Sequence, residues 1–224
     1  MTLRKTVIFD LDGTLVDTSR DLIAGANACF EALGLGAVLD AEADAATALR
    51  GGRAMLREGL GRADLDWDES TVDREFPNFI RHYEAVIDAT SRPFDGAEAA
   101  VRRLRHAGYA TGICTNKPER LSELLLTRLG LRDLFDSHIG ADTLPVRKPD
   151  PEPLRQAVLR AGGDPGRAVI IGDTDTDRNT AAAAGIAAVL VTFGPLGESV
   201  AELRPEALLH RFEDLGAVVA GLIG

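Results

Sequence analysis

The sequence is short of basic residues, of cysteine and of long apolar runs, and each shortage excludes a class of protein. Its 25 Lys and Arg residues are outnumbered by 35 Asp and Glu, which gives a net charge of -10. A nucleic-acid partner requires basic patches, so we expect none. The chain has only two cysteines, Cys29 and Cys114. Two cysteines make a poor disulfide framework and suit a reducing compartment.

No apolar stretch approaches the length that crosses a bilayer. The apolar run after Lys5 starts too early and is too brief for a signal peptide. We therefore expect a cytoplasmic protein without a membrane partner, either a monomer or a homodimer. With 224 residues, 45% of them hydrophobic, the chain has the composition of a globular protein and is long enough for one domain with an insert.

Short apolar runs alternate with longer helical patterns, which is typical of parallel strands joined by helices. The expected strands are 6–10, 110–115, 137–141, 168–173 and 187–193. The expected helices are 96–108, 118–130, 150–162 and 177–186, followed by a short strand and a closing helix in the tail. Because the strands are apolar throughout, helices should cover both faces of the sheet. The pattern predicts an α/β fold with a Rossmann-like parallel sheet.

Residues 18–90 interrupt this alternation, because they contain helical stretches and no convincing strand. Ser91-Arg92-Pro93 then breaks the last of these helices. We expect a small helical cap domain, residues 18–90, inserted after the first strand. The α/β core domain would consist of residues 1–17 and 91–224.

Polar residues gather at the expected strand ends, where open parallel sheets bind their ligands. A single Asp in such a place is usually a turn residue or a helix cap, but four strands that end this way indicate a site. In an extended chain two acids one residue apart point to the same side, a repulsion that a nearby cation would relieve. In strand order the polar residues are Asp10 and Asp12; Thr115 and Asn116; Arg147 and Lys148; and Asp173, Asp175 and Asp177.

These residue types supply the parts of a phosphoryl-transfer site. Asp10 is a candidate carboxylate nucleophile, and Asp12 is a candidate general acid and base. Asp10 and Asp173 offer the hard oxygen ligands that suit Mg²⁺. The Thr115 hydroxyl and the Lys148 ammonium would hold phosphate oxygens, and Lys148 would also keep Asp10 ionised.

The stretches DLDGTLVD, TNKP, RKPDPEPL and GDTDTD together resemble the four ordered motifs of the haloacid-dehalogenase-like (HAD) hydrolase superfamily. The resemblance covers the whole chain, with residues 18–90 in the place of the small cap domain. It implies that Asp10 is the nucleophile, Asp12 the acid and base, Thr115 a phosphate ligand and Lys148 the supporting cation.

The same resemblance implies a Mg²⁺ site. The ion would be held by the side chains of Asp10 and Asp173 and by the backbone carbonyl of Asp12. Asp177 matches the second acid of the last motif, which supports the ligands from behind. Asp175 has no counterpart and is interpreted as a helix-start or solvent residue.

Two features narrow the reaction within this superfamily. An acid at Asp12 argues against dehalogenation and favours a phosphate ester, whose alkoxide leaving group needs a proton. The three lysines are Lys5, Lys117 and Lys148. None lies in the expected cap, which excludes the branch that forms a Schiff base there.

The fuller stretches around the motifs resemble phosphoglycolate phosphatases, which implies 2-phosphoglycolate as substrate. The cap stretch LRGGRAMLREGL places arginines around Gly51-Gly52, where Gly52 and Arg53 are candidates to bind a small anionic leaving group. These arginines have an equally plain interpretation as a solvated helix face. Asn116 is a third candidate substrate-binding residue, and Lys117 beside it lines either the phosphate pocket or the cap interface. A sugar-phosphate phosphatase, a β-phosphoglucomutase-like enzyme and a non-catalytic binding protein are the alternatives.

Overall fold

The computed structural model describes residues 3–63 and 66–224. The chain divides into two compact units, Met1–Val16 with Pro93–Gly224, and Asp17–Arg92. It passes from one unit to the other and back through two short strands that pair with each other, β2 (Val16–Asp17) and β3 (Arg92–Pro93). No helix in the described parts of the chain is long and apolar enough to cross a membrane.

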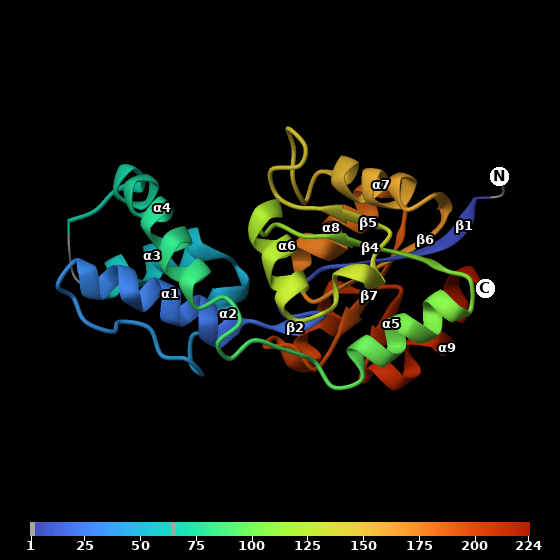
Figure 1. The fold of residues 1–224 in the computed structure, drawn as a ribbon, viewed down its shortest axis with the longest axis horizontal. Coiled ribbons are helices and arrows are strands. Elements are labelled where there is room, and N and C mark those ends of the chain that lie inside the picture. The colour runs from blue at the N-terminus through green and yellow to red at the C-terminus, as the bar shows by residue number, and fades with distance from the viewer. Residues whose placement is uncertain (1–2, 64–65) are drawn as a thin grey trace. The chain divides into compact units, whose positions relative to one another are not determined.

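The larger unit is built on a six-stranded sheet in the order β5-β4-β1-β6-β7-β8 (Figure 1). All neighbouring strands pair in parallel. The predicted fold class is confirmed, and the five strands predicted with bounds each overlap an observed strand, although β6 begins at Gly163, five residues before its predicted start at 168. The strands are β1 (Arg4–Phe9), β4 (Ala110–Cys114), β5 (Ser137–Ile139), β6 (Gly163–Gly172), β7 (Ala187–Val191) and β8 (Ala207–Leu209).

Helices cover both faces of this sheet, as the apolar strands require. One face packs against α7 and α8, and α5 and α9 lie together on the other (Figure 1). Ile8 and Ile170, from the two central strands, are fully buried with Cys114 in the core under α7 and α8. The helices are α5 (Ala97–His106), α6 (Glu119–Arg128), α7 (Pro151–Arg160), α8 (Asp175–Ala184) and α9 (Leu215–Ile223), with short 3-10 turns η1 (Arg132–Leu134), η2 (Gly197–Leu203) and η3 (Phe212–Asp214).

The strand order reverses at β1, which has β4 on one side and β6 on the other. The connection after β1 leads to β4 on one side and the connection after β6 leads to β7 on the other, so the loops at the carboxyl ends of these central strands part and leave room for a ligand. The loops in question follow Phe9, Cys114 and Gly172. This topology brings polar residues that are far apart in the sequence to one edge of the sheet.

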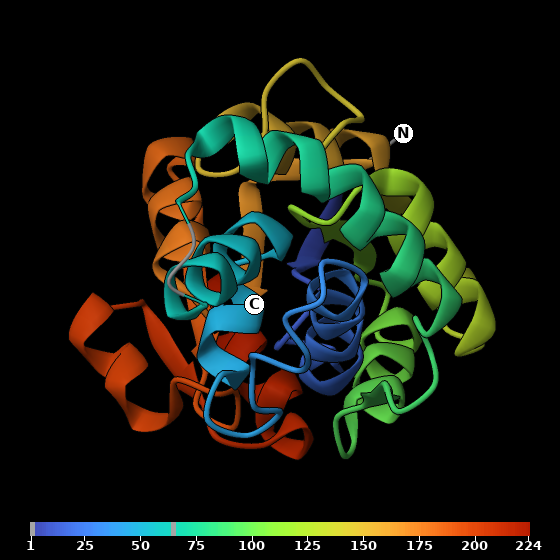
Figure 2. The same cartoon turned by 90° about the vertical axis from the view of Figure 1, so that its left-hand side faces the viewer.

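The smaller unit is helical, with α1 packed against α4 and α3 (Figure 2). Close packing leaves no room for a side chain at two of its glycines. A Cβ on Gly25 would lie 2.8 Å from the Tyr83 backbone, and a Cβ on Gly52 would overlap the Phe79 ring. The helices of this unit are α1 (Ser19–Ala32), α2 (Ala45–Leu49), α3 (Gly52–Arg62) and α4 (Glu69–Ala85).

A buried carboxylate ties the two ends of the helical unit together. Asp21, in the first turn of α1, is 2% exposed. It accepts hydrogen bonds from the backbone N–H and the hydroxyl of Thr90, at 3.0 and 2.6 Å, and from the same two groups of Ser91, at 2.8 and 2.7 Å. Four donors replace the lost hydration of this charge, and a helix N-terminus favours a negative group.

Replacing Asp21 with alanine should therefore destabilise the protein, because it leaves the buried N–H and hydroxyl of Ser91 without an acceptor. We expect the free energy of unfolding to fall by roughly 2–4 kcal/mol, measured by urea unfolding followed by circular dichroism. Glu31→Ala, at an exposed position of the same helix, is the matched control and should change it by less than about 0.5 kcal/mol. Equal effects of the two substitutions would contradict a special role for Asp21.

Candidate active site

The first three site residues are placed by the ends of the central strands. β1 ends at Phe9, and Asp10 continues its ladder by one hydrogen bond, from its N–H to the Ile171 carbonyl at 2.9 Å. Thr115 extends β4 in the same way, with its N–H 2.9 Å from the Ile139 carbonyl. Asp173 follows directly after the end of β6. Backbone pairing with neighbouring strands thus fixes where the Asp10 and Thr115 side chains start.

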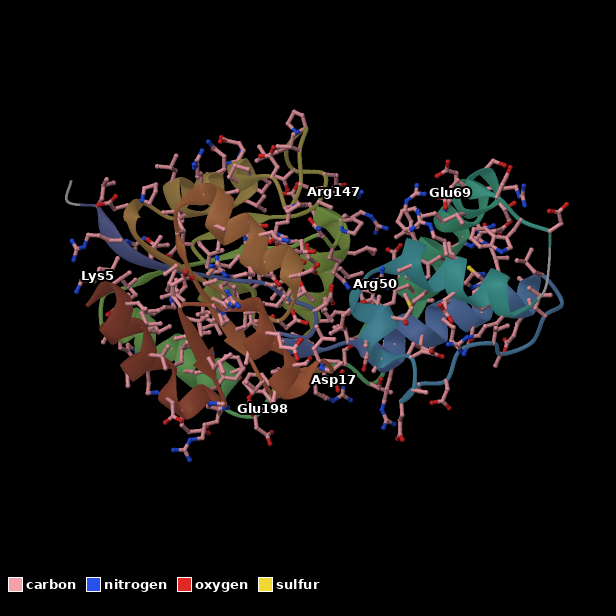
Figure 3. All side chains as sticks on the ribbon, turned by 180° about the vertical axis from the view of Figure 1, so that it is seen from behind. Lys5, Asp17, Arg50, Glu69, Arg147 and Glu198 are labelled. Carbon is pink, nitrogen blue, oxygen red and sulfur yellow. The ribbon has the colours of Figure 1, made fainter. Side chains whose placement is uncertain are left out.

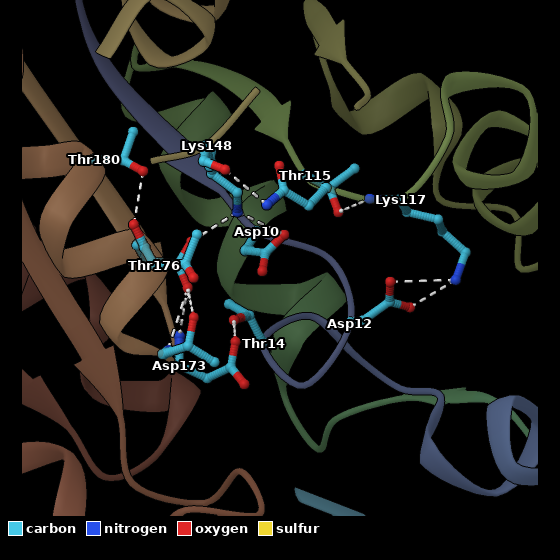
Figure 4. Close-up of polar contacts among 12 residues, drawn as sticks. Asp10, Asp12, Thr14, Thr115, Lys117, Lys148, Asp173, Thr176 and Thr180 are labelled. Carbon is cyan, nitrogen blue, oxygen red and sulfur yellow. Dashed lines mark hydrogen bonds and ion pairs between the residues drawn. The ribbon is translucent and has the colours of Figure 1, made fainter. Parts of the chain in front are cut away.

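The Lys148 side chain lies in the centre of this group and is only 2% exposed. Its Nζ lies 3.1 Å from Oδ1 of Asp10 (Figure 4) and 2.7 Å from Oδ1 of Asp177. Asn116 fixes the Lys148 loop, because its side-chain amide donates to the Lys148 carbonyl at 3.0 Å. The structure therefore brings together the predicted nucleophile and the predicted supporting cation.

Asp177 is fully buried and has its hydrogen-bonding capacity filled by the protein. Its Oδ1 binds Lys148, and its Oδ2 accepts the backbone N–H groups of Asp173 and Thr174, each at 3.2 Å, and the Thr174 hydroxyl at 2.9 Å. Thr174 and Asp177 form a capping box, so α8 begins at Asp175. The predicted helix start at 177 is two residues late, because this cap recruits the preceding turn.

Asp173 is held by a residue that sequence reasoning missed. The hydroxyl of Thr14 donates to Oδ1 of Asp173 at 2.9 Å, and both residues are buried. The available signal was the position of Thr14 directly after Gly13, whose φ of 79° turns the chain back toward the sheet. The hydrogen bond restrains Oδ1 and leaves the second carboxylate oxygen for another partner.

The expectation that Asp10 and Asp12 share a face rests on strand alternation, and β1 extends only as far as Phe9. The Asp12 carboxylate forms an ion pair with Lys117, whose Nζ lies 2.9 and 3.2 Å from its two oxygens (Figure 4). The Thr115 hydroxyl accepts the Lys117 backbone N–H at 3.2 Å, which anchors the residue that carries this ammonium.

The remaining predicted substrate-binding residues lie in the helical unit. Arg53 pairs with Asp73 at 2.5 Å and stacks on the Phe76 ring, with 4.7 Å from its guanidinium carbon to the ring centre. Arg57, one turn on, is bidentate to Glu69. Packing against the Phe79 ring is enough to explain why residue 52 is glycine. Contact of Gly52 and Arg53 with a substrate stays a prediction.

Burial dominates the electrostatics of the core group. It raises the pKa of Asp10 to about 6, against the lowering effect of Lys148. Burial also raises the pKa of Asp173 well above its ordinary value, with further contributions from Asp177 and Asp10. For Lys148, burial lowers the pKa but the two neighbouring carboxylates overcome it and raise it. Three carboxylates beside one ammonium carry two uncompensated negative charges when all are ionised.

Comparison with known proteins agrees with this geometry. Residues 7–191 match the family of haloacid dehalogenase-like hydrolases. The chain belongs to this family. It is 40% identical over 217 residues to a phosphoglycolate phosphatase of Mesorhizobium japonicum, covering 97% of this chain and 95% of that protein. A phosphoglycolate phosphatase of Agrobacterium fabrum is 35% identical over 215 residues, covering 95% and 91% of the two chains.

Among solved structures, the fold is similar to that of a Haemophilus somnus protein named as a predicted phosphoglycolate phosphatase. The TM-score is 0.85 at 25% identity, and the match covers 97% of this chain and 99% of that one. The recognition of a HAD-like hydrolase from its four motifs is confirmed. The relatives match the chain over nearly its whole length, helical unit included.

The acidic group of this HAD-like hydrolase fits a divalent cation. Asp10, Asp173 and Asp177 each offer an oxygen within 4.8 Å of the others. Within the described residues, Oδ1 of Asp10 and Oδ2 of Asp173 are buried without a hydrogen-bond partner. Lys148 lies 3.1 Å from the first of these, but outside hydrogen-bonding geometry. Because Asp177 is already saturated, the open oxygens belong to Asp10 and Asp173, and a divalent ion would balance the excess charge.

Binding of a divalent cation should stabilise the protein more at pH 7.5 than at pH 5.0. Without metal, the raised pKa values favour the folded state below pH 3.8, and this contribution is lost as pH rises through about 6. A cation binds the ionised carboxylates and restores the stability lost at the higher pH. At a free Mg²⁺ concentration one hundred times Kd the gain is about 2.7 kcal/mol, measured as a shift in melting temperature.

EDTA should reverse this shift, and Asp173→Asn should reduce it at both pH values. Asp175→Asn, which alters an exposed acid at the start of α8, should leave it unchanged. A shift of the same size at both pH values, or one that survives Asp173→Asn, would contradict a metal site at these carboxylates.

Proposed function

We propose that this HAD-like hydrolase is a Mg²⁺-dependent phosphatase of small organic phosphate monoesters, with 2-phosphoglycolate as the leading substrate. The observation that carries the proposal is the buried Lys148 ammonium between Asp10 and Asp177, beside two carboxylate oxygens that lack hydrogen-bond partners. A protein gains no stability from such a charge imbalance. It suits a site that binds a cation together with a phosphate ester.

In the first half of the proposed reaction, an oxygen of Asp10 attacks phosphorus. The new bond joins Asp10 to the phosphoryl group, and the bond from phosphorus to the leaving oxygen breaks. Asp12 gives its proton to that oxygen, which departs as an alcohol. Lys148 favours the ionised form of the nucleophile by its positive charge, and the Thr115 hydroxyl holds a phosphoryl oxygen as charge redistributes.

In the second half, water attacks the phosphorus of the aspartyl-phosphate. Asp12, now ionised, accepts a proton from this water, and the bond between Asp10 and phosphorus breaks to release phosphate. Both residues return to their starting protonation states. The helical unit would act as a cap that excludes bulk water while the acyl phosphate exists.

The side chains of Asp10 and Asp173 and the backbone carbonyl of Asp12 would hold Mg²⁺. When bound, the ion supplies positive charge that screens the phosphate from the attacking carboxylate. Thr14 and Asp177 orient these groups, since Thr14 restrains one oxygen of Asp173 and Asp177 binds the backbone N–H of the same residue. Such supporting contacts normally tune both affinity and geometry at a metal site.

The substrate assignment draws on the relatives named phosphoglycolate phosphatase, which match the chain over nearly its whole length. The glycolate leaving group carries a carboxylate, so the enzyme needs a cation beside the leaving oxygen. The arginines of the α3 stretch are one source of that cation, although Arg53 and Arg57 already have acidic partners.

Asp10→Asn tests the nucleophile. The substitution is nearly isosteric and removes one charge from an over-acidic group, so the fold should persist with an equal or higher melting temperature. Turnover of 2-phosphoglycolate with Mg²⁺ should fall by about three orders of magnitude or more, measured by release of inorganic phosphate. Asp175→Asn is the control and should retain full activity. Substantial turnover by Asp10→Asn would rule out the covalent route.

Arg53→Gln tests the contribution of the helical unit to specificity. If Arg53 binds the glycolate carboxylate, KM for 2-phosphoglycolate should rise by about tenfold, while KM for p-nitrophenyl phosphate, whose leaving group has no carboxylate, should change little. Arg57→Gln, one helical turn away and equally paired with an acid, is the matched control. Equal changes in KM for both esters would assign Arg53 to the solvated face of α3.

A further inference from the structure

The proposed reaction uses Lys148 but gives no task to Lys117, the residue whose ammonium touches the predicted acid and base. The Lys117 side chain is 3% exposed, and Asp12 is 16% exposed. Its Nζ spans the Asp12 carboxylate, 2.9 Å from one oxygen and 3.2 Å from the other. A buried ammonium is expensive to desolvate, and a buried ion pair is generally no more stable than an apolar pair. Stability alone gives no reason for a lysine here.

The backbone of Lys117 holds this ammonium in a defined place. Its N–H donates to the Thr115 hydroxyl at 3.2 Å, and its carbonyl accepts the Ala141 N–H at 2.9 Å. α6 begins two residues later, at Glu119. The residue is thus fixed between the predicted phosphate ligand and the loop after β5, on the core unit itself.

The position of Nζ relative to Asp12 sets what it can reach. An acid that protonates the leaving oxygen must lie within one hydrogen-bond length of it. The Lys117 Nζ is itself hydrogen-bonded to Asp12, so two hydrogen-bond lengths separate it from the leaving oxygen and the distance is about 6 Å at most. In 2-phosphoglycolate a single methylene carbon separates the leaving oxygen from a carboxylate. Lys148 is engaged elsewhere, by Asp177 and by Asp10, which lies beside it in Figure 4.

We propose that Lys117 binds the carboxylate of the leaving group and thereby selects esters whose alcohol carries an anion one carbon from the oxygen. The inference rests on the proposed phosphatase function and adds a specificity residue in the core unit. As Asp12 turns toward the leaving oxygen, the substrate carboxylate replaces it as the partner of Lys117. The ammonium then stays paired throughout. A phosphate ester whose alcohol carries no anion offers no replacement and leaves Asp12 bound to Lys117.

The test compares 2-phosphoglycolate with ethyl phosphate, in which a methyl group replaces the carboxylate. The wild-type enzyme should cleave 2-phosphoglycolate with the higher kcat/KM. Lys117→Met should lower that kcat/KM by about 10- to 100-fold, the effect of losing one charge-assisted hydrogen bond. The value for ethyl phosphate should stay within about threefold or rise, because Asp12 is released. The ratio of the two values should therefore collapse.

Two further variants and a control complete the design. Lys117→Arg keeps the charge and should restore part of the preference. Lys117→Gln keeps a hydrogen-bond donor for Asp12 without the charge, and it should behave like Lys117→Met, so it serves if the methionine variant fails to fold. Lys5→Met removes a lysine near the start of β1 (Figure 3), above the Tyr109 ring, and should change neither kcat/KM.

The outcomes separate this inference from the proposed function. If the wild type prefers 2-phosphoglycolate and the Lys117 variants keep that preference, the inference is wrong and the substrate assignment stands. Equal losses on both esters would also overturn it, because Lys117 would then act only through Asp12. If the wild type shows no preference for the carboxylate ester, the substrate assignment falls and the inference falls with it.

Discussion

The placement of three carboxylates around one buried ammonium is the constraint on which the rest of the site depends. Asp10, Asp173 and Asp177 meet at Lys148 because a parallel sheet brings the ends of its central strands to one edge. A folded chain accepts this repulsion only where every charge is held in place. The strand ladders, the α8 capping box and the Thr14 hydroxyl all provide that restraint. The result is a set of oxygens prepared for a cation before it arrives.

The sheet and most of the site residues could be predicted from the sequence, because short local patterns indicate both. Continuous apolar runs such as 168–173 mark buried parallel strands, and polar residues directly after them mark the ligand edge of the sheet. Asp10, Thr115 and Asp173 lie where this reasoning places them, one residue beyond β1, β4 and β6. Lys148 is further from its strand, and its place followed from the family motif rather than from periodicity.

The remainder depends on side-chain contacts that sequence spacing does not specify. Alternation predicts side-chain directions only within a strand, and β1 ends at Phe9, before both Asp10 and Asp12. The partner of Asp12 is 105 residues away, so no local pattern identifies it. Thr14 likewise contacts Asp173 across 159 residues. The start of α8 was recoverable, since Thr174 and Asp177 have the spacing of a capping box.

The Asp21 cluster has a consequence for how such a protein can diversify. The carboxylate ties the first turn of α1 to Thr90 and Ser91, so the inserted segment closes on itself through its own hydrogen bonds. The entropic cost of bringing the two ends of the segment together is then offset by these hydrogen bonds and not by the core strands that flank it. A segment with its ends joined in this way is a replaceable module. Recombination could exchange it for a helical segment of another length, changing which alcohols are accepted while the phosphate chemistry is inherited unchanged.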